Sequence, residues 1–109
     1  MKVLITGTNG QLRTFDSDGF SLGSNVSVNN SGGNYVSWNW LASNTTASNT
    51  DGSITSTVSA NTTSGFSIVS YTGTGSAATV GHGLGAVPKM IIVKNRTDSI
   101  NWQIYNSTV

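Results

Sequence analysis

Residues 54–71 have the sequence Ile-Thr-Ser-Thr-Val-Ser-Ala-Asn-Thr-Thr-Ser-Gly-Phe-Ser-Ile-Val-Ser-Tyr, and this stretch decides the fold. Ile54, Ser56 and Val58 alternate with threonines, which is the period of a half-buried strand. The polar segment 61–65 is typical of a turn, and the apolar run that completes the stretch is typical of a second strand. We therefore predict a β-hairpin here.

Further strands are predicted towards the end of the chain. Pro88 fixes an extended approach to the apolar run Met-Ile-Ile-Val at 90–93, which we expect to be a central, well-covered strand. The segment 95–98 is turn-like, and apolar residues alternate again over 100–104.

Upstream, the segment 15–20 predicts a turn between two apolar positions, followed by a short alternating strand. The clearest strand is predicted at 35–41, where Val36, Trp38 and Trp40 fall on one face at period two. Core packing is therefore expected for Trp38 and Trp40.

The whole pattern predicts an all-β protein. More than half of the 109 residues are Ser, Thr, Asn or Gly, there is no Glu, and no stretch has apolar residues at helical spacing. Strands separated by frequent turns favour an antiparallel sandwich or jelly-roll-like pair of sheets. The predicted organisation is an N-terminal strand and turn at 1–12, strands at 13–41, a linker at 42–52 and a second β module at 53–109.

Charge and composition exclude several functions. The formal net charge is +1 and only 8% of residues are charged, so no basic surface is available to follow phosphates and we expect no nucleic-acid partner. Weak mutual repulsion favours association of copies. The chain has no cysteine, which excludes disulfides and thiolate metal sites, and no apolar run long enough for membrane insertion.

Residues 1–12, Met-Lys-Val-Leu-Ile-Thr-Gly-Thr-Asn-Gly-Gln-Leu, resemble the opening of NAD(P)-dependent short-chain reductases that act on nucleotide sugars. In that family the glycine-rich turn leads into a helix that holds the cofactor pyrophosphate. Arg13 stands where the family has its third glycine, and 15–19 is unsuited to a helix. We therefore expect an edge strand and a turn here, and no cofactor. A reductase fragment is the most remote alternative and requires a helix after Gly10.

No catalytic or metal-binding residue is predicted. His82 is the only histidine and has no second His, Cys or Glu to complete a site, so we predict a structural turn formed by His82, Gly83 and Pro88. Aspartates 16, 18 and 51 lack the remaining ligands of a calcium loop, and turns stabilised by their side chains are the better interpretation. We expect a protein that is not an enzyme.

Aromatic side chains are the better candidates for binding. If several share an exposed face, they can stack on sugar rings. The candidate residues for contact with a glycan or a host surface are Tyr35, Tyr71 and Tyr105.

Several ordered segments resemble one known group of proteins. Phe-Asp-Ser-Asp-Gly-Phe-Ser-Leu-Gly at 15–23 and Tyr-Val-Ser-Trp-Asn-Trp at 35–40 resemble the closing strands of a lectin-like sandwich in tail-fibre and tail-associated proteins of marine bacteriophages. The segments 49–61, 65–73 and 79–94 resemble the module that follows it there. The similarity covers about residues 11–106, and the N-terminal segment of about twelve residues is not family-like.

This resemblance implies a structural component of a phage tail or tail fibre that contributes to host attachment. It implies a location in the virion after synthesis in the bacterial cytoplasm, with other virion proteins, copies of the chain or a host-surface glycan as partners. Because the related proteins have more strands on both sides, we expect an internal fragment or a shortened gene product. The alternative from another class is a free carbohydrate-binding module or adhesin.

Overall fold

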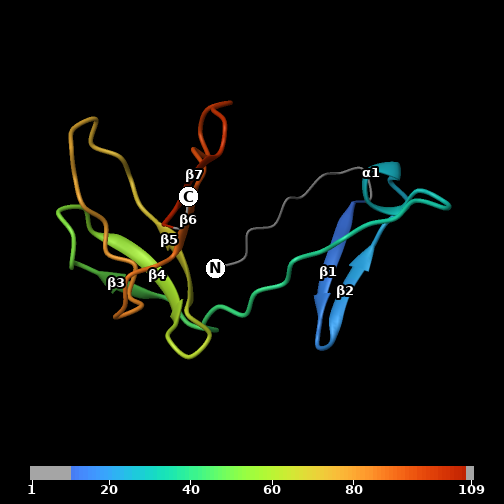
Figure 1. The fold of residues 1–109 in the computed structure, drawn as a ribbon, viewed down its shortest axis with the longest axis horizontal. Coiled ribbons are helices and arrows are strands. Elements are labelled where there is room, and N and C mark those ends of the chain that lie inside the picture. Colours follow the sequence, from blue (N-terminus) through green and yellow to red (C-terminus); the bar gives the residue numbers. More distant parts are fainter. Residues whose placement is uncertain (1–10, 108–109) are drawn as a thin grey trace. The chain divides into compact units, whose positions relative to one another are not determined.

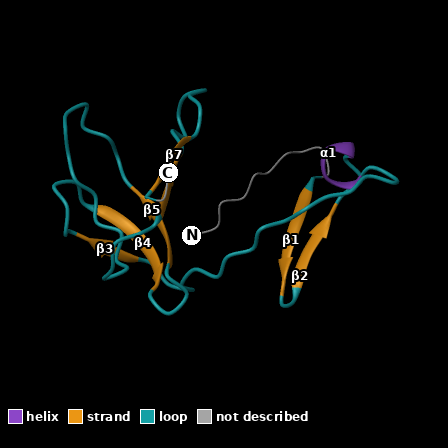
Figure 2. Cartoon of the chain, in the orientation of Figure 1, coloured by secondary structure: helices purple, strands orange, loops and turns teal. Residues whose placement is uncertain are grey.

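The computed structural model describes residues 11–107, and nearly all of its regular structure is β-strand. All paired strands are antiparallel, which confirms the predicted all-β class with antiparallel sheets. Figures 1 and 2 show the described elements, which form sheets of two, three and two strands beside one turn of helix. In chain order they are β1 (Leu12–Asp16), β2 (Gly19–Leu22), α1 (Val26–Asn29), β3 (Ala47–Asn49), β4 (Ser56–Asn61), β5 (Phe66–Ser70), β6 (Met90–Val93) and β7 (Gln103–Asn106).

The described residues divide into two compact units, 11–39 and 40–107. The first contains β1, β2 and α1, and the second contains β3 to β7. The division therefore lies before the segment 42–52, where the sequence predicted a linker. The strand and turn predicted within 1–10 lie outside the described residues.

In the unit 11–39, β1 and β2 form a hairpin, which confirms the turn predicted at 15–20. The Asp16 carboxylate stabilises it. One oxygen accepts a hydrogen bond from Thr14 Oγ1 at 2.8 Å, and the other accepts one from Ser21 Oγ at 2.9 Å. Because these hydroxyls come from both strands, a slip in register would break at least one of the two bonds.

The short helix α1 is held by side chains at both ends. Asn25 caps its start, because Asn25 Oδ1 accepts a hydrogen bond from the Ser27 amide at 2.9 Å. After the helix, the Tyr35 hydroxyl donates to the Val26 carbonyl at 2.8 Å and accepts from the Asn30 amide at 2.9 Å. The Tyr35 side chain thus fixes the chain after α1 against the helix through two hydrogen bonds to its backbone.

The strand predicted at 35–41 is absent, and this segment is irregular. No described strand pairs with it. Both tryptophans expected in the core are exposed, Trp38 by 71% and Trp40 by 62%, although Trp40 stacks on Phe66 with ring centroids 5.7 Å apart and planes inclined by 9°. The prediction was wrong because a strand needs a neighbouring strand to hydrogen-bond its backbone N–H and C=O groups. A period-two pattern shows which side chains would share a face, but it does not show whether such a neighbour exists.

The unit 40–107 is built on the three-stranded sheet β3–β4–β5. The hairpin predicted first from the sequence is confirmed, since β4 pairs antiparallel with β5. In its turn, Asn61 Oδ1 accepts hydrogen bonds from the amides of Thr63 and Ser64 at 3.1 and 3.0 Å. Gly65 closes the turn with a φ of 67°, a left-handed conformation that glycine adopts without strain.

Strand β3 lies inside the segment 42–52, so the linker prediction is corrected there. β3 pairs antiparallel with β4, and Ala47 lies opposite Val58. The polar composition of this segment excludes it from an apolar core. It does not prevent strand pairing, because the hydrogen bonds of a sheet join N–H and C=O groups that nearly every residue carries.

The central strand β4 is covered on one face by the irregular segment 79–83. Ser56 Oγ donates a hydrogen bond to the Gly81 carbonyl at 3.0 Å. Ser56 is 2% exposed and Val58 is 7% exposed, and Val58 is the one large apolar side chain that is buried within the described residues. This face of β4 is therefore the core of the unit, and it is formed largely by small side chains and backbone.

Two glycines allow the chain just before β4 to lie close to the segment 79–81. A Cβ at Gly52 would lie 2.7 Å from the Thr79 carbonyl carbon and 2.8 Å from Val80 Cα, and one at Gly81 would overlap an asparagine side chain. Two hydrogen bonds between Ser53 and Thr79 hold these parts of the chain together. The Ser53 amide donates to Thr79 Oγ1, and the Thr79 amide donates to Ser53 Oγ, both at 2.9 Å.

The opposite face of β4 contacts the segment that enters the unit. Ser59, which is 1% exposed, donates from Oγ to the Ser43 carbonyl at 2.6 Å. The Leu41 carbonyl accepts hydrogen bonds from Asn61 Nδ2 at 3.3 Å and from Ser64 Oγ at 3.1 Å. Both faces of β4 are thus covered by irregular chain through bonds between side chains and backbone.

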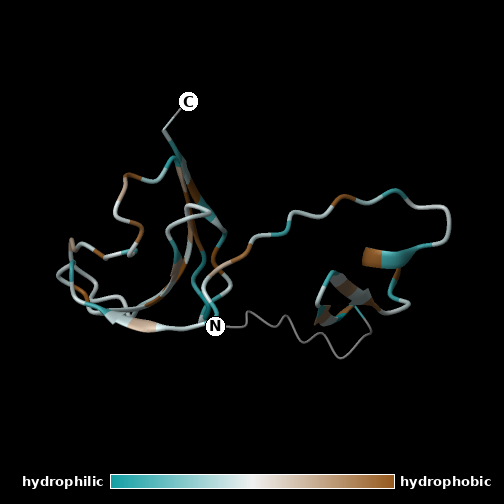
Figure 3. Ribbon diagram, turned by 90° about the horizontal axis from the view of Figure 1, so that it is seen from below, coloured by the Kyte–Doolittle hydropathy of each residue, from teal (hydrophilic) through white to brown (hydrophobic). Residues whose placement is uncertain are grey.

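Strands β6 and β7 form a separate two-stranded ribbon, with Ile91 opposite Tyr105 and Ile92 opposite Ile104. The strand predicted at 90–93 is confirmed, but its expected burial is wrong, because all four of its residues are exposed. In Figure 3 brown marks apolar residues on the strands that lead to the C-terminus. β6 has β7 as its one neighbour among the described strands, and its side chains range from 36% exposed at Val93 to 54% exposed at Met90.

Replacing Gly52 by alanine tests the close contact between Gly52 and the backbone of Thr79 and Val80. We expect Gly52→Ala to lower the free energy of unfolding by about 1–3 kcal/mol, because the new methyl group would collide with backbone atoms of Thr79 and Val80. Gly73→Ala is the matched control, since a Cβ at Gly73 has no atom within 4 Å. Urea unfolding of both variants makes the comparison, and equal stability would contradict this account of the core.

Candidate functional surfaces

The three tyrosines predicted to contact a glycan or a host surface are distributed over both units. Tyr35 lies in the unit 11–39, and its hydroxyl is engaged by the backbone around α1. Tyr71 directly follows β5, where it is 44% exposed and begins the exposed segment 71–79. Tyr105 lies in β7 on the exposed ribbon. The structure therefore places the three side chains in three different local settings.

His82, Gly83 and Pro88 line an open hollow of about 530 Å³ in the unit 40–107. The Leu84 amide donates a hydrogen bond to His82 Nδ1 at 3.2 Å, and Gly83 between them has a φ of 71°. The imidazole thus acts as an acceptor for a backbone amide two residues on, as the side chain of Asn or Asp does in an Asx-turn.

Asp51 contributes the acidic group of the same hollow. Its amide donates to Asn49 Oδ1 at 3.0 Å, and its Oδ2 accepts from Asn49 Nδ2 at 2.9 Å. The remaining lining is glycine together with Val80, Ala86, Val87 and Pro88. The lining thus combines two polar side chains, Asp51 and His82, with apolar ones.

The aspartates considered as calcium ligands take part in local structure. Asp16 accepts bonds from hydroxyls of its hairpin, and Asp51 is bound by Asn49. Within the part of the chain that the structure describes, no three His, Cys, Asp or Glu side chains come together as a metal site.

The segment after Gly10 does not have the conformation that a reductase requires. Residues 12–16 form strand β1, so Arg13 lies in a strand and not in the first turn of a helix. Among residues 11–107, no helix is long and apolar enough to cross a bilayer.

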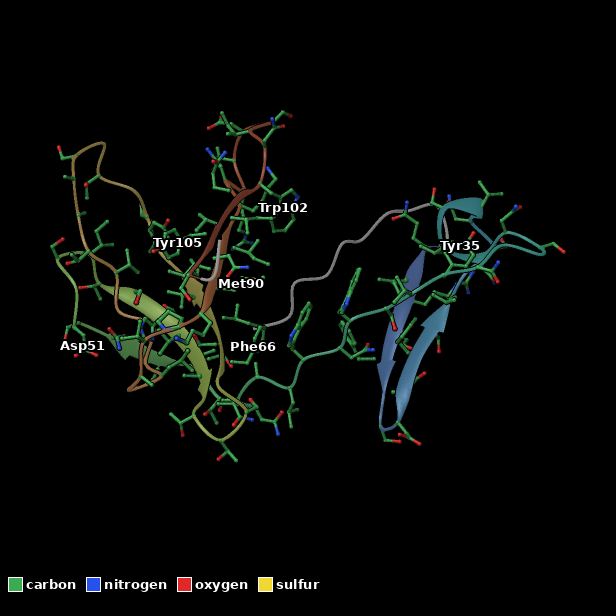
Figure 4. The ribbon with its side chains drawn as sticks, in the orientation of Figure 1. Tyr35, Asp51, Phe66, Met90, Trp102 and Tyr105 are labelled. Atoms are coloured by element: carbon green, nitrogen blue, oxygen red, sulfur yellow. The ribbon has the colours of Figure 1, made fainter. Side chains whose placement is uncertain are left out.

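An apolar surface is exposed on strand β6, which the sequence analysis expected to be well covered, and on the adjacent strand β7. We call it the apolar ribbon, and it consists of β6 and β7 with the neighbouring Trp102. Figure 4 labels Met90, Trp102 and Tyr105 on it. The sequence contained a sign of this exposure. A run of four apolar residues is buried only if both faces of its strand are covered, and the sequence near 90–93 predicts one further strand, over 100–104.

His82 provides a test of the turn beside the hollow. We expect His82→Ala to lower the free energy of unfolding by about 1 kcal/mol, because the Leu84 amide loses its acceptor. His82→Asn should retain most of that stability, because its side-chain oxygen can accept the same bond. Urea unfolding gives the stabilities, and hydrogen exchange of the Leu84 amide reports the turn directly. Equal losses in both variants would mean that the imidazole acts through packing.

Comparison with known proteins identifies one family. A family described as a domain of unknown function, DUF7483, matches residues 4–109 of the chain. Neither the curated proteins nor the solved structures contain a significant match.

Proposed function

We propose that this chain, which belongs to the DUF7483 family, is a structural module of a bacteriophage tail or tail fibre and not an enzyme. It acts by packing against copies of itself or against other virion proteins. The observation that carries this proposal is the apolar ribbon, whose large apolar side chains range from 36% exposed at Val93 to 66% exposed at Ile104. Surfaces of this kind mark sites of protein interaction.

Two features of the sequence support the same function. The ordered similarity of residues 11–106 to tail-fibre and tail-associated proteins of marine bacteriophages gives the proposal its viral setting, and with it a location in the virion. The net charge of +1 allows copies to approach with little repulsion.

The oligomeric state of the purified chain tests this function. We expect far-UV circular dichroism of a β-rich protein and, by light scattering, a mass well above the 11.3 kDa of one chain. A β-rich monomer would count against an assembly module and would favour the alternative, a free carbohydrate-binding module or adhesin.

Attachment to a host-surface glycan is a second proposed activity, and it is favoured at Tyr71. Its half-exposed ring begins the segment 71–79, in which every residue is exposed. An aromatic face in such a position can stack on a sugar ring.

Substitution of Tyr71 separates this activity from assembly. We expect Tyr71→Ala to weaken binding to a responsive oligosaccharide about tenfold, whereas Tyr71→Phe, which keeps the ring face, should bind nearly as well. The measurement is a fluorescence titration with a panel of bacterial surface oligosaccharides. Undiminished binding by Tyr71→Ala, or no binding by the unchanged chain, would refute this role.

A further inference from the structure

Trp40 and Phe66 form an exposed aromatic platform within the unit 40–107. Their rings are nearly parallel, with planes inclined by 9° and centroids 5.7 Å apart. One face of the indole therefore lies against Phe66, which is half-buried at the start of β5 and is labelled in Figure 4. Trp40 is nevertheless 62% exposed, so its other face is turned to water.

The backbone beside Trp40 is fixed by side chains of the β4–β5 hairpin. The Leu41 carbonyl accepts hydrogen bonds from Asn61 Nδ2 at 3.3 Å and from Ser64 Oγ at 3.1 Å. Asn61 lies opposite Phe66 in the register of β4 and β5, so one end of the hairpin holds both the ring beneath Trp40 and the backbone next to it. The platform is therefore positioned before a ligand arrives, which lowers the entropy cost of binding.

The area of the platform suits one small ring and not a protein partner. A large aromatic side chain presents at most about 250 Å², so Trp40 at 62% exposure offers on the order of 150 Å². A standard protein interface takes about 800 Å² from each partner. Adding the neighbouring Leu41, which is 69% exposed, leaves the apolar area well below that value.

The surroundings of the platform favour a neutral, hydroxylated ligand. The segments that form it, 40–43 and 59–66, contain no charged residue, so nothing in them pairs with a phosphate or a carboxylate group. A stacked nucleotide would therefore leave its phosphate unpaired. Thr62 and Thr63 are exposed in the turn that joins β4 to β5, and their hydroxyls can exchange hydrogen bonds with those of a ligand.

We propose that Trp40 is a binding site for a neutral pyranose whose ring hydroxyls are equatorial, as in a β-linked glucose unit. Axial C–H bonds cover both faces of such a ring, so one face can lie flat on the indole. Tyr71 follows the other end of β5 and is a separate site. This inference rests on the proposed attachment to a host-surface glycan, and it adds a second site and a class of sugar to that activity.

Titration of the full chain with cellohexaose, a neutral β-linked glucose oligomer, tests this site. We expect Trp40→Ala to weaken binding about tenfold, and Trp40→Phe, which keeps a ring face, to bind within about threefold of the unchanged chain. Trp38→Ala is the matched control, because Trp38 is 71% exposed but has no stacked ring beneath it among the described residues. Its affinity for cellohexaose should stay unchanged. Isothermal titration calorimetry gives the affinities.

Nuclear magnetic resonance keeps the test valid if Trp40→Ala disturbs the fold. In the unchanged chain, the ring current of an indole stacked on the sugar should move the axial ring protons of the bound glucose unit upfield. These shifts should persist in Trp38→Ala and in Tyr71→Ala, because both variants keep the platform. Loss of the shifts in either variant would contradict the assignment to Trp40.

The outcomes separate this site from the function on which it rests. A loss of about tenfold in Trp40→Ala, with full affinity in Trp38→Ala, supports the site. Full affinity in Trp40→Ala, no binding of cellohexaose, or tighter binding of a galacturonic acid hexamer overturns it. Attachment at Tyr71 still stands in these cases if Tyr71→Ala loses binding to its own oligosaccharide. A lower mass of Trp40→Ala by light scattering without sugar would show that the platform contacts protein, and would also overturn the site.

Discussion

The unit 40–107 depends on the contact between the central strand β4 and the backbone of the segment 79–83. Before β4 begins, Gly52 lies against the backbone of Thr79 and Val80, and Gly81 lies against the side chain of Asn49, so a Cβ at either glycine would collide with these atoms. Ser56 then donates to the Gly81 carbonyl. On the other face Ser59 donates to the Ser43 carbonyl. The strand is thus enclosed by hydroxyl groups bound to carbonyls, and each buried hydroxyl has a partner.

A core made of such small groups has a consequence for the large apolar side chains. Backbone segments that approach this closely leave little space for them, and among the described residues Val58 is the one large apolar side chain that is buried. Trp38, Trp102 and Ile104 remain largely exposed. Apolar surface that a small domain normally buries on folding therefore stays exposed here, and its burial against another protein would favour association. This is the physical connection between the fold and the proposed assembly function.

Local features of the fold were predictable because their causes lie within a few residues. In the turns at 61–65 and 95–98, the side-chain oxygens of Asn61 and Asn95 accept hydrogen bonds from nearby backbone amides. In the hairpin at 15–20, the Asp16 carboxylate accepts a hydrogen bond from the Ser21 hydroxyl. The irregular segment 35–41 and the exposure of 90–93 were not predictable in this way. Each depends on which other parts of the chain pack against the segment, and the local pattern of apolar residues does not specify that.

The features of the candidate surfaces were likewise predictable where their causes are local and not predictable where they depend on packing. Residue type and local spacing sufficed to predict the all-β class and the hairpin of β4 and β5, and to single out the tyrosines as candidates for contact. The folded chain was needed to show that the Tyr35 hydroxyl bonds to backbone around α1, that His82 accepts a backbone bond beside Asp51 and that strand β6 is exposed. Burial is a property of what packs against a residue, and that depends on parts of the chain far away in sequence.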